Sequence, residues 1–481
     1  MKYKCKICSY QTEENINSSY ICPHCGSSYQ DFQIIDEVDK RIPIAISNPS
    51  VERIMEKCIN CGRCKTVCEE IVGIHYDYSK ALEPVCVNCG QCILNCPTGA
   101  LVTKSSYKKV LDYIHDTSKI VVVSTAPAVR VSLGEAFNLE SGSFVEGKMV
   151  SALKKIGFDY VFDITFGADL TIIEEASELV SRLEKKELLP QFTSCCPSWV
   201  KYVSIYHPLL LKHLSTCKSP IGMQSAMIKN YLADYLEVDK SDIINVVIAP
   251  CTSKKMEIVS TESSLDTDFL LTTNELSQMI KEMLIDFNSL EDEKFDKLLG
   301  LGSGAGLIFG SSGGVMEAVL RTTYHYLTNE QTPKEFLTFN DLHGSKEVKT
   351  ASITIKDKTL NVAVIEGLAN TESFIKEVLD KKSPYQFIEV MNCMGGCSGG
   401  GGQILGNISK NKENSEIRAS QLYEEDLKKD LRLSYLNKEI IEAYKSYLIK
   451  PLSTISKELL HTVHTDKSSI LGETLNINIE K

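Results

Sequence analysis

Eight cysteines between residues 58 and 96 restrict the fold of this chain more than any other feature. They form two runs, Cys58-x2-Cys61-x2-Cys64-x3-Cys68 and Cys86-x2-Cys89-x2-Cys92-x3-Cys96, and Pro97 follows the second. Three cysteines at such intervals fit three corners of a cuboidal iron–sulfur cluster, and the fourth of each run ligates the other cluster. The runs predict two [4Fe-4S] clusters, the first held by Cys58, Cys61, Cys64 and Cys96 and the second by Cys86, Cys89, Cys92 and Cys68.

The alternative for these runs is a pair of zinc sites. Zinc ligands usually come in pairs of cysteines and not in quartets that end in Cys-Pro, so the spacing favours iron–sulfur clusters. Residues 48–108 resemble the bacterial two-cluster ferredoxins, although Glu69 stands where the first run would have its proline. The resemblance implies a small α+β domain that moves electrons one at a time.

A second metal site is predicted for residues 1–36, from Cys5-x2-Cys8 and Cys22-x2-Cys25. A segment this short cannot fold around a hydrophobic core alone, so a metal must hold it together. Four thiolates in a tetrahedron suit either zinc or a single iron. The aromatic residues Tyr3, Tyr20 and Phe32 near the ligands resemble a shortened rubredoxin-like domain, and the neighbouring electron carriers favour iron slightly.

Charge and cysteine content indicate where such a chain works. The 52 Lys and Arg against 63 Asp and Glu give a net charge of -11 with no basic run, so nucleic acid and anionic membranes are not expected partners. No stretch is long and apolar enough to span a membrane, and the first residues show no apolar signal core. We therefore expect a cytoplasmic protein whose many cysteines, 18 in all, form metal sites rather than a disulfide framework.

Residues 118–465 have a different pattern, in which short apolar runs alternate with long amphipathic stretches. KIVVVSTAP, INVVIAPC and FIEVMNC read as buried strands, and EEASELVSRLEKK reads as a helix. This alternation predicts an α/β domain with largely parallel sheets, with its motifs at the ends of strands, where open α/β folds bind ligands. The polar residues 466–481 are expected to be a fraying tail.

Cysteines in this third block follow no ferredoxin spacing. Cys195 and Cys196 are adjacent, so their side chains point in different directions and both are unlikely to bind one centre. Setting aside Cys195 and the isolated Cys217 leaves four thiols from three distant segments, the number that a cubane requires. They are Cys196, Cys251, Cys393 and Cys397. Six glycines within residues 395–402 would let backbone approach a bulky ligand closely.

These motifs together resemble the catalytic domain of [FeFe]-hydrogenases. The resemblance covers TSCCPSW, APCTSKK, EVMNCMGGCSGGGGQ, TAPAVRVSLGEAF and IFGSSGGVMEAVLR, and it implies two lobes with parallel-rich sheets. It also implies an H-cluster, in which a [4Fe-4S] cube is joined through a cysteine sulfur to a diiron subsite with CO, cyanide and azadithiolate. By the same resemblance the four thiols would hold the cube, Cys397 would bridge to the diiron unit, and Ala126, Pro127 and Met391 would pack around it.

The resemblance assigns a proton route as well. Cys195 would stay unligated and exchange protons with the subsite, and Lys254 would donate to a cyanide. Glu175 and Glu178 lie three apart on a predicted helix and so share one face. Such glutamates are normally solvated, but their alignment with the family's relay positions, together with Ser215 and Arg182, favours a role in proton transfer.

The resemblance predicts a ferredoxin hydrogenase that reversibly reduces protons to H2. Its partners would be a ferredoxin-like electron carrier and the maturation machinery of the diiron subsite. Two alternatives remain, a hydrogen sensor of low turnover and a hydrogenase-like protein of iron–sulfur assembly. The sequence departs from common family residues at four positions that alter packing or hydrogen bonding but remove no predicted ligand. These are Ala128, Ile221, Ala249 and Ile404.

Overall fold

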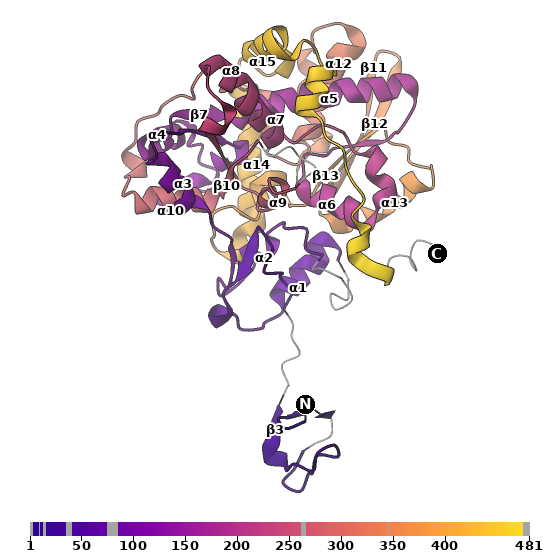
Figure 1. Cartoon of the computed structure of the whole chain (residues 1–481). Coiled ribbons are helices and arrows are strands. Elements are labelled where there is room, and N and C mark those ends of the chain that lie inside the picture. Colours follow the sequence, from indigo (N-terminus) through magenta and orange to yellow (C-terminus); the bar gives the residue numbers. More distant parts are fainter. Residues whose placement is uncertain are drawn as a thin grey trace.

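The computed structural model describes residues 3–8, 10–12, 16–34, 41–74, 85–260, 266–344 and 346–474 (Figure 1). Its first body is a three-stranded antiparallel sheet of order β2-β1-β3. The strands are β1 (Tyr3–Cys5), β2 (Gln11–Thr12) and β3 (Phe32–Ile34). The edge of Tyr20 packs on the ring of Phe32, with 5.4 Å between centroids. This core is small, as expected for a segment that depends on a metal.

The second body holds the two cysteine runs. Strands β4 (Val51–Arg53) and β5 (Leu101–Thr103) pair antiparallel, and the helices α1 (Arg63–Val67) and α2 (Gln91–Leu94) pack against each other. A small apolar core joins these elements, and thiols of the runs contribute to it. The body is therefore the small α+β unit that the sequence predicts.

The first lobe of the large domain is built on a fully parallel sheet of order β10-β9-β6-β7. The strands are β6 (Ile120–Thr125), β7 (Tyr160–Asp163), β9 (Ile243–Ala249) and β10 (Phe269–Thr272). Every residue of β9 is buried, as expected when helices cover both faces of a parallel sheet. The helices packed on the lobe include α3 (Tyr107–Ile114), α4 (Glu146–Ile156), α7 (Pro220–Met227) and α10 (Thr273–Glu282).

The second lobe has a mixed sheet of order β11-β12-β13-β8. Only the edge strand β11 (Val348–Ile355) is antiparallel to its neighbour β12 (Lys358–Glu366), while β13 (Phe387–Met391) and β8 (Gln191–Phe192) continue the sheet in parallel. Its helices include α6 (Pro197–Tyr206), α12 (Gly314–Thr328) and α13 (Glu372–Leu379). A further helix, α14 (Asn411–Lys428), packs through Leu422 on the residues that follow β6. The prediction of two parallel-rich sheets is confirmed.

One long helix, α5 (Ile164–Lys185), ties the two lobes together (Figure 1). Phe166 and Leu170 pack into the core of the first lobe with residues of α7, and Ile172 and Leu179 pack into the core shared with α12. The Asp163 side chain caps the helix by accepting a hydrogen bond from the Thr165 N–H at 3.0 Å. The helix is buried on two sides because it lies between two sheets. Burying a polar side chain on it costs free energy, so such side chains are expected to have a function.

The predicted domain boundary near residue 108 falls at the start of α3, since Val110 of this helix belongs to the first lobe's core. The expected fraying tail is wrong over Ser468–Thr474, which form a 3-10 helix packed on α6 with Leu471 fully buried. Ile470 packs on the same core, so two adjacent apolar side chains dock an otherwise polar segment. None of the described helices combines the length and apolar character needed to cross a membrane.

Candidate active site between the two sheets

A cavity with about 770 Å³ of empty space lies where the two sheets meet. The chain segments that line it leave the carboxyl ends of β6, β9, β13 and β8. Parallel strands direct these ends to a common edge, which explains why distant motifs converge there. Among the sequence-predicted residues the cavity is lined by Ala126, Pro127, Cys195, Cys196, Cys251, Lys254, Met391, Cys393 and Cys397.

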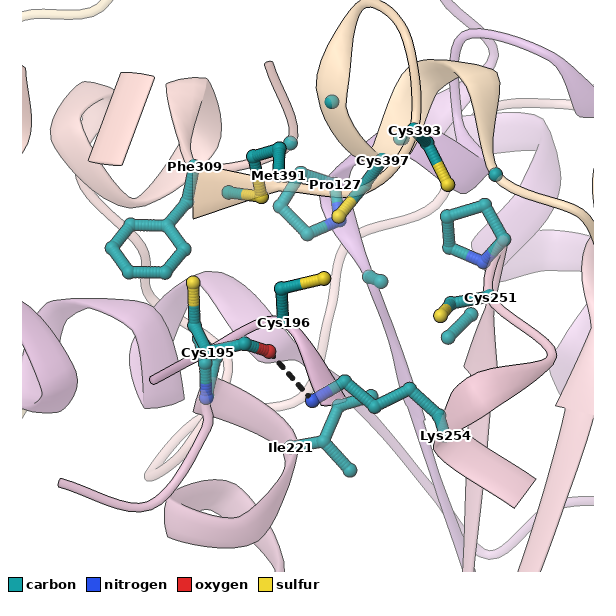
Figure 2. A pocket seen from close by; sticks show the side chains of 18 of the residues that line it. Pro127, Cys195, Cys196, Ile221, Cys251, Lys254, Phe309, Met391, Cys393 and Cys397 are labelled. Carbon is teal, nitrogen blue, oxygen red and sulfur yellow. Dashed lines mark hydrogen bonds between the residues drawn. The ribbon is translucent and has the colours of Figure 1, made fainter. Parts of the chain in front are cut away.

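Four thiols surround one part of this cavity. Figure 2 shows the sulfurs of Cys196, Cys251, Cys393 and Cys397 directed toward a common space. Burial raises the pKa of Cys251 to about 11, and the neighbouring Cys196 adds to the shift. Burial likewise raises the pKa of Cys397 to about 12, with further contributions from Cys251 and Cys196. Buried thiols crowded in this way need a polycationic centre before they can ionise together.

Cys195 is directed elsewhere. Figure 2 shows its sulfur pointing toward Phe309 and Met391, away from the space that the other four sulfurs share. Its side chain is buried at 9% exposure, and burial followed by the nearby Glu175 carboxylate raises its pKa well above the usual range. The thiol therefore keeps its proton in this environment. Adjacent cysteines thus occupy different surroundings, as the sequence predicts.

Lys254 places one cation beside the thiols. Its Nζ donates to the carbonyl of Cys195 at 3.1 Å and lies 2.7 Å from the Glu257 carboxylate. Burial by itself would lower the pKa of this ammonium, but the Glu257 carboxylate outweighs burial and the net shift is upward. Lys254 is therefore charged and fixed at the cavity wall, unlike a typical lysine in solvent.

The glycine-rich loop after β13 serves close packing as much as cavity shape. Gly400 lines the cavity, and a Cβ there would lie 2.2 Å from the Pro250 carbonyl oxygen. A Cβ on Gly401 would lie 2.3 Å from the carbonyl oxygen of Cys89 in the cluster domain. The loop is therefore clamped between the cavity and the cluster domain, and side chains at these positions would force the two apart.

A chain of polar groups leads from Cys195 toward the surface along α5. Glu175 is fully buried, and neither of its carboxylate oxygens has a hydrogen-bond partner among the described residues. Burial raises the pKa of Glu175 to about 8, and the neighbouring Glu178 charge adds to this. Ser215 donates to Glu178 Oε2 at 2.9 Å. A carboxyl whose pKa lies near neutrality can take up and release protons.

The outer end of this chain meets solvent. Arg182 Nη2 lies 2.6 Å from Glu178 Oε1, and both side chains are mostly buried. The two residues line a surface depression with about 1260 Å³ of empty space, together with Thr216 and His461. The structure therefore brings Glu178, Ser215 and Arg182 together in one hydrogen-bonded group, one helical turn from Glu175.

The other predicted ligands also converge. Cys58, Cys61, Cys64 and Cys96 line one pocket of the cluster domain. In the second predicted set, burial raises the pKa of Cys89 most, and Cys68 and Cys86 raise it further. These thiols therefore lie close to one another. At the N-terminus the ligand sulfurs of Cys5, Cys8, Cys22 and Cys25 lie within 4.8 Å of one another. Their closest pairs, at 3.5 and 3.6 Å, are near the roughly 3.8 Å expected between tetrahedral thiolate ligands.

Sequence reasoning missed one contact between domains. Gln91, which lies inside the second cysteine run, donates through Nε2 to Cys393 Sγ at 3.2 Å and to the Gly399 carbonyl at 2.8 Å. Burial raises the pKa of Cys393 most, and the neighbouring Cys251 and then Cys89 raise it further, so Cys393 also lies close to a thiol of the cluster domain. The only sequence signal was a polar residue at the start of a helix that otherwise packs inward.

The four residues that differ from the common family residues lie on or near the cavity. Ala249 and Ile221 line it and are almost fully buried, and Ala128 lines it as well. Gln403 Nε2 donates to the Ala128 carbonyl at 3.2 Å, so the neighbouring Ile404 lies behind the wall and not in it. All of the cavity residues among these departures are apolar. They make the wall around the four thiols drier than polar residues would.

The residues fit an iron–sulfur group extended by a second metal unit. Four thiols that line the cavity and one fixed ammonium supply the charge that such a group requires, and the remaining wall is mostly apolar. The empty volume extends from the four thiols to Cys195, Phe309 and Met391, where no ligating thiol points (Figure 2). A cube alone would leave that part of the cavity unfilled.

Comparisons with known proteins agree with this geometry. Residues 119–401 match the family described as the iron only hydrogenase large subunit, C-terminal domain, and residues 412–467 match the iron hydrogenase small subunit. The chain is 42% identical over 440 residues to the NADP-reducing hydrogenase subunit HndD of Solidesulfovibrio fructosivorans, covering 86% of this chain and 74% of that protein.

Structural and more distant relatives extend the comparison. The structure of a variant of apo [FeFe]-hydrogenase HydA1 from Chlamydomonas reinhardtii is similar with a TM-score of 0.65 and 36% identity, covering 75% of this chain and 98% of that one. A probable cytosolic Fe-S cluster assembly factor of Nematostella vectensis is 29% identical over 360 residues, covering 72% of this chain and 77% of that protein. The chain therefore belongs to the iron-only hydrogenases, oxidoreductases that act on hydrogen.

Proposed function

We propose that this chain catalyses the reversible reduction of protons to H2. The observation that carries the proposal is the position of Cys195, a buried thiol that faces the cavity while the four neighbouring sulfurs face a common space (Figure 2). An assembly protein has no need for a protonated thiol at that place. An enzyme that must deliver protons to a dry cavity does need one.

Cys196, Cys251, Cys393 and Cys397 would hold the cube of an H-cluster, and Ala126, Pro127 and Met391 would pack around its diiron part. When bound, this group supplies the site at which protons and electrons combine. Lys254 holds a positive charge at the wall and offsets the charge of the bound group. Phe309 and the apolar departures exclude water from the same wall.

The chain's own acid–base groups would carry the protons. Glu178 exchanges protons with solvent at the depression, where Arg182 holds one of its oxygens. Ser215 donates to the other oxygen, and it is close enough to Glu175 for its hydroxyl to oppose part of the rise in the pKa of that carboxyl. Glu175 then passes the proton inward, and Cys195 presents it at the cavity.

Electrons would arrive through the cluster domain. Its two predicted [4Fe-4S] clusters lie on the side of the glycine-rich loop, where Gln91 touches Cys393. The N-terminal site, with one iron or zinc, would extend this route if it holds iron. The partners implied are a ferredoxin or similar small carrier and the maturation machinery for the diiron subsite, in the cytoplasm.

The test is anaerobic production with the maturation machinery, infrared spectroscopy for CO and cyanide bands, and a gas assay. We expect both bands and H2 turnover, and we expect Cys195→Ala to keep the bands but lose turnover by about 100-fold or more. Cys217→Ala is the matched control, because it removes a buried thiol outside the cavity. Loaded iron–sulfur clusters without CO or cyanide bands would favour an assembly role, and full bands with slow turnover a sensor.

A further inference from the structure

Three side chains with metal-ligating atoms meet beneath the surface depression. Glu178 of α5, Cys217 and His461 have ligand atoms that lie within 4.8 Å of one another. Cys217 Sγ lies 4.0 Å from Glu178 Oε2, and the backbones of Cys217 and His461 form an isolated antiparallel bridge. Three segments distant in sequence therefore converge here. The iron–sulfur sites and the cavity use neither Cys217 nor His461.

His461 is oriented as metal-binding histidines are. Its Nε2 lies 3.1 Å from the Glu174 carboxylate, and its Nδ1 lies 2.8 Å from the Thr216 hydroxyl. Glu174 also accepts from the Tyr444 hydroxyl at 2.6 Å and from the Leu452 N–H at 2.9 Å. A carboxylate with these partners is an acceptor, so Nε2 carries the proton and the lone pair of Nδ1 faces Thr216. A carboxylate behind a ligating histidine fixes the ring in the same way.

The cluster can be reached from solvent. Glu178 and His461 line the depression, and Thr216, which separates them, is exposed. Arg182 binds Glu178 Oε1, so the other oxygen, Oε2, is the one nearest Cys217. Rotation of the Thr216 hydroxyl would leave Oε2, Sγ and Nδ1 around one position.

The net charge of the side chains around the three ligand atoms favours binding of a dication. Arg182 pairs with Glu178 at 2.6 Å and offsets one negative charge of the cluster. The depression also carries Lys185, Lys212 and Lys457, which weaken cation binding at its rim. Glu178 and an ionised Cys217 supply two negative charges at the cluster itself, and Glu174 supplies a third behind His461. One oxygen, one sulfur and one nitrogen form a donor set that zinc accepts, with water as a fourth ligand.

We propose that Glu178, Cys217 and His461 form a zinc site that closes the proton entrance when it is filled. On binding, the Cys217 thiol gives its proton to solvent, a Zn–S bond forms, and no electrons are transferred. Coordination occupies the Glu178 oxygen that Ser215 and Thr216 now contact. The proposed metal site depends only on the three side chains, whereas the proposed blockage of proton entry depends on the proposed function of Glu178.

The first test measures bound zinc. The full chain, with its iron–sulfur clusters and N-terminal site already loaded, is exposed to zinc chloride, desalted and analysed for metal and for X-ray absorption at the zinc edge. We expect one more zinc in the wild type than in Cys217→Ala or His461→Gln, with mixed sulfur and nitrogen or oxygen ligands. His213→Gln is the matched control, since this nearby histidine contacts the Pro190 carbonyl and not the cluster. Equal zinc in all four proteins would overturn the site.

The second test measures H2 turnover against zinc concentration. Wild type and His213→Gln should lose turnover as zinc is added, while Cys217→Ala should require about tenfold more zinc or higher for the same loss. The loss in each protein is expressed relative to its own turnover without zinc. Zinc binding without inhibition would overturn the blockage. A loaded protein with no turnover at all would contradict the proposed function, and the zinc difference between variants would still decide the metal site.

Discussion

The burial of Glu175 illustrates how the fold determines the environment of a single residue. Two glutamates one turn apart on a helix normally lie in solvent, and only their alignment with the family's relay positions favours a role in proton transfer. Here the helix is enclosed by two lobes, so Glu175 is fully buried and has no hydrogen-bond partner among the described residues. The cysteine spacing could predict convergence of thiols, but the burial of this carboxyl depends on packing between distant elements.

Burial of Glu175 should make stability depend on pH. Its pKa rises from the usual 4.5 to about 8, so the folded chain binds a proton that the unfolded chain releases in this range. Stability from this group is complete below pH 4.5 and declines as pH rises toward 8. In thermal unfolding measured across this pH range, the stability of Glu175→Gln should lack this part of the decline. Glu389, whose pKa burial raises to about 7, titrates in both proteins, so the difference between them is the measure.

The same substitution separates structure from proton transfer. Glu175→Gln should lower H2 turnover by roughly 100-fold or more, because an amide cannot exchange the proton. The infrared bands of the loaded protein should be unchanged. A variant that loses both bands and turnover has lost the cavity, and a variant that keeps full turnover contradicts the proposed route.

At the scale of elements, the strands were predictable and their partners were not. Apolar runs identify β6, β9 and β13 because strands in a parallel sheet are buried on both faces. The polar segment Ser468–Thr474 docks through Leu471, a contact that no local pattern reveals. Glu389 lies on the apolar β13 and accepts from the N–H groups of Gly313 and Met316, so it holds the start of α12. Propensity and periodicity carry no information on such tertiary contacts.

The packing of α12 on α14 depends on one buried arginine. Arg321 Nη2 lies 2.6 Å from Glu317 and 2.7 Å from Asp426, and all three side chains are almost completely buried. Arg321→Met would remove the fully buried cation from both carboxylates, leaving Asp426 with the more exposed Arg432 and Glu317 with the His343 ring. We expect a loss of about 3–5 kcal/mol in the free energy of unfolding.

Chemical denaturation of the cluster-loaded chain measures this loss. Arg432 contacts Asp426 from a more exposed position, so Arg432→Met is the matched control and should cost less. Equal losses in the two variants would mean that burial does not set the strength of this contact.

At the scale of the whole molecule, the cluster domain and the cavity are coupled through Gln91. Hydrogen bonds to a ligand sulfur stabilise the reduced cluster and raise its potential. Gln91→Leu removes the contact with Cys393, so the potential of the group held there should fall by on the order of tens of millivolts. Potentiometric EPR of the loaded protein measures it. Asn95→Leu is the control, because Asn95 binds only its own helix at the Gln91 carbonyl.

The two family segments of the chain are fastened by buried polar contacts as well. Residues 412–467 match a small subunit, and residues 119–401 match a large one. Across this division Arg418 pairs with Glu135 at 2.5 Å, Asn437 donates to Asp169 at 2.8 Å, and Tyr444 donates to Glu174 at 2.6 Å. Sequence periodicity says nothing of these partners. The buried contacts between the two segments therefore contribute more to holding them together than the peptide connection does.

Cutting that connection should leave the molecule intact. Leu405 is exposed, and a Cβ on Gly406 would meet no atom, so a protease site inserted between them can be reached without strain. After cleavage we expect the two fragments to co-elute in gel filtration without denaturant and to keep their H2 turnover. The same cut in the Arg321→Met background should release the smaller fragment more readily, because Asp426 then loses its buried cation. Separation of the unsubstituted fragments would show that the covalent link, and not the buried contacts, holds this part of the fold.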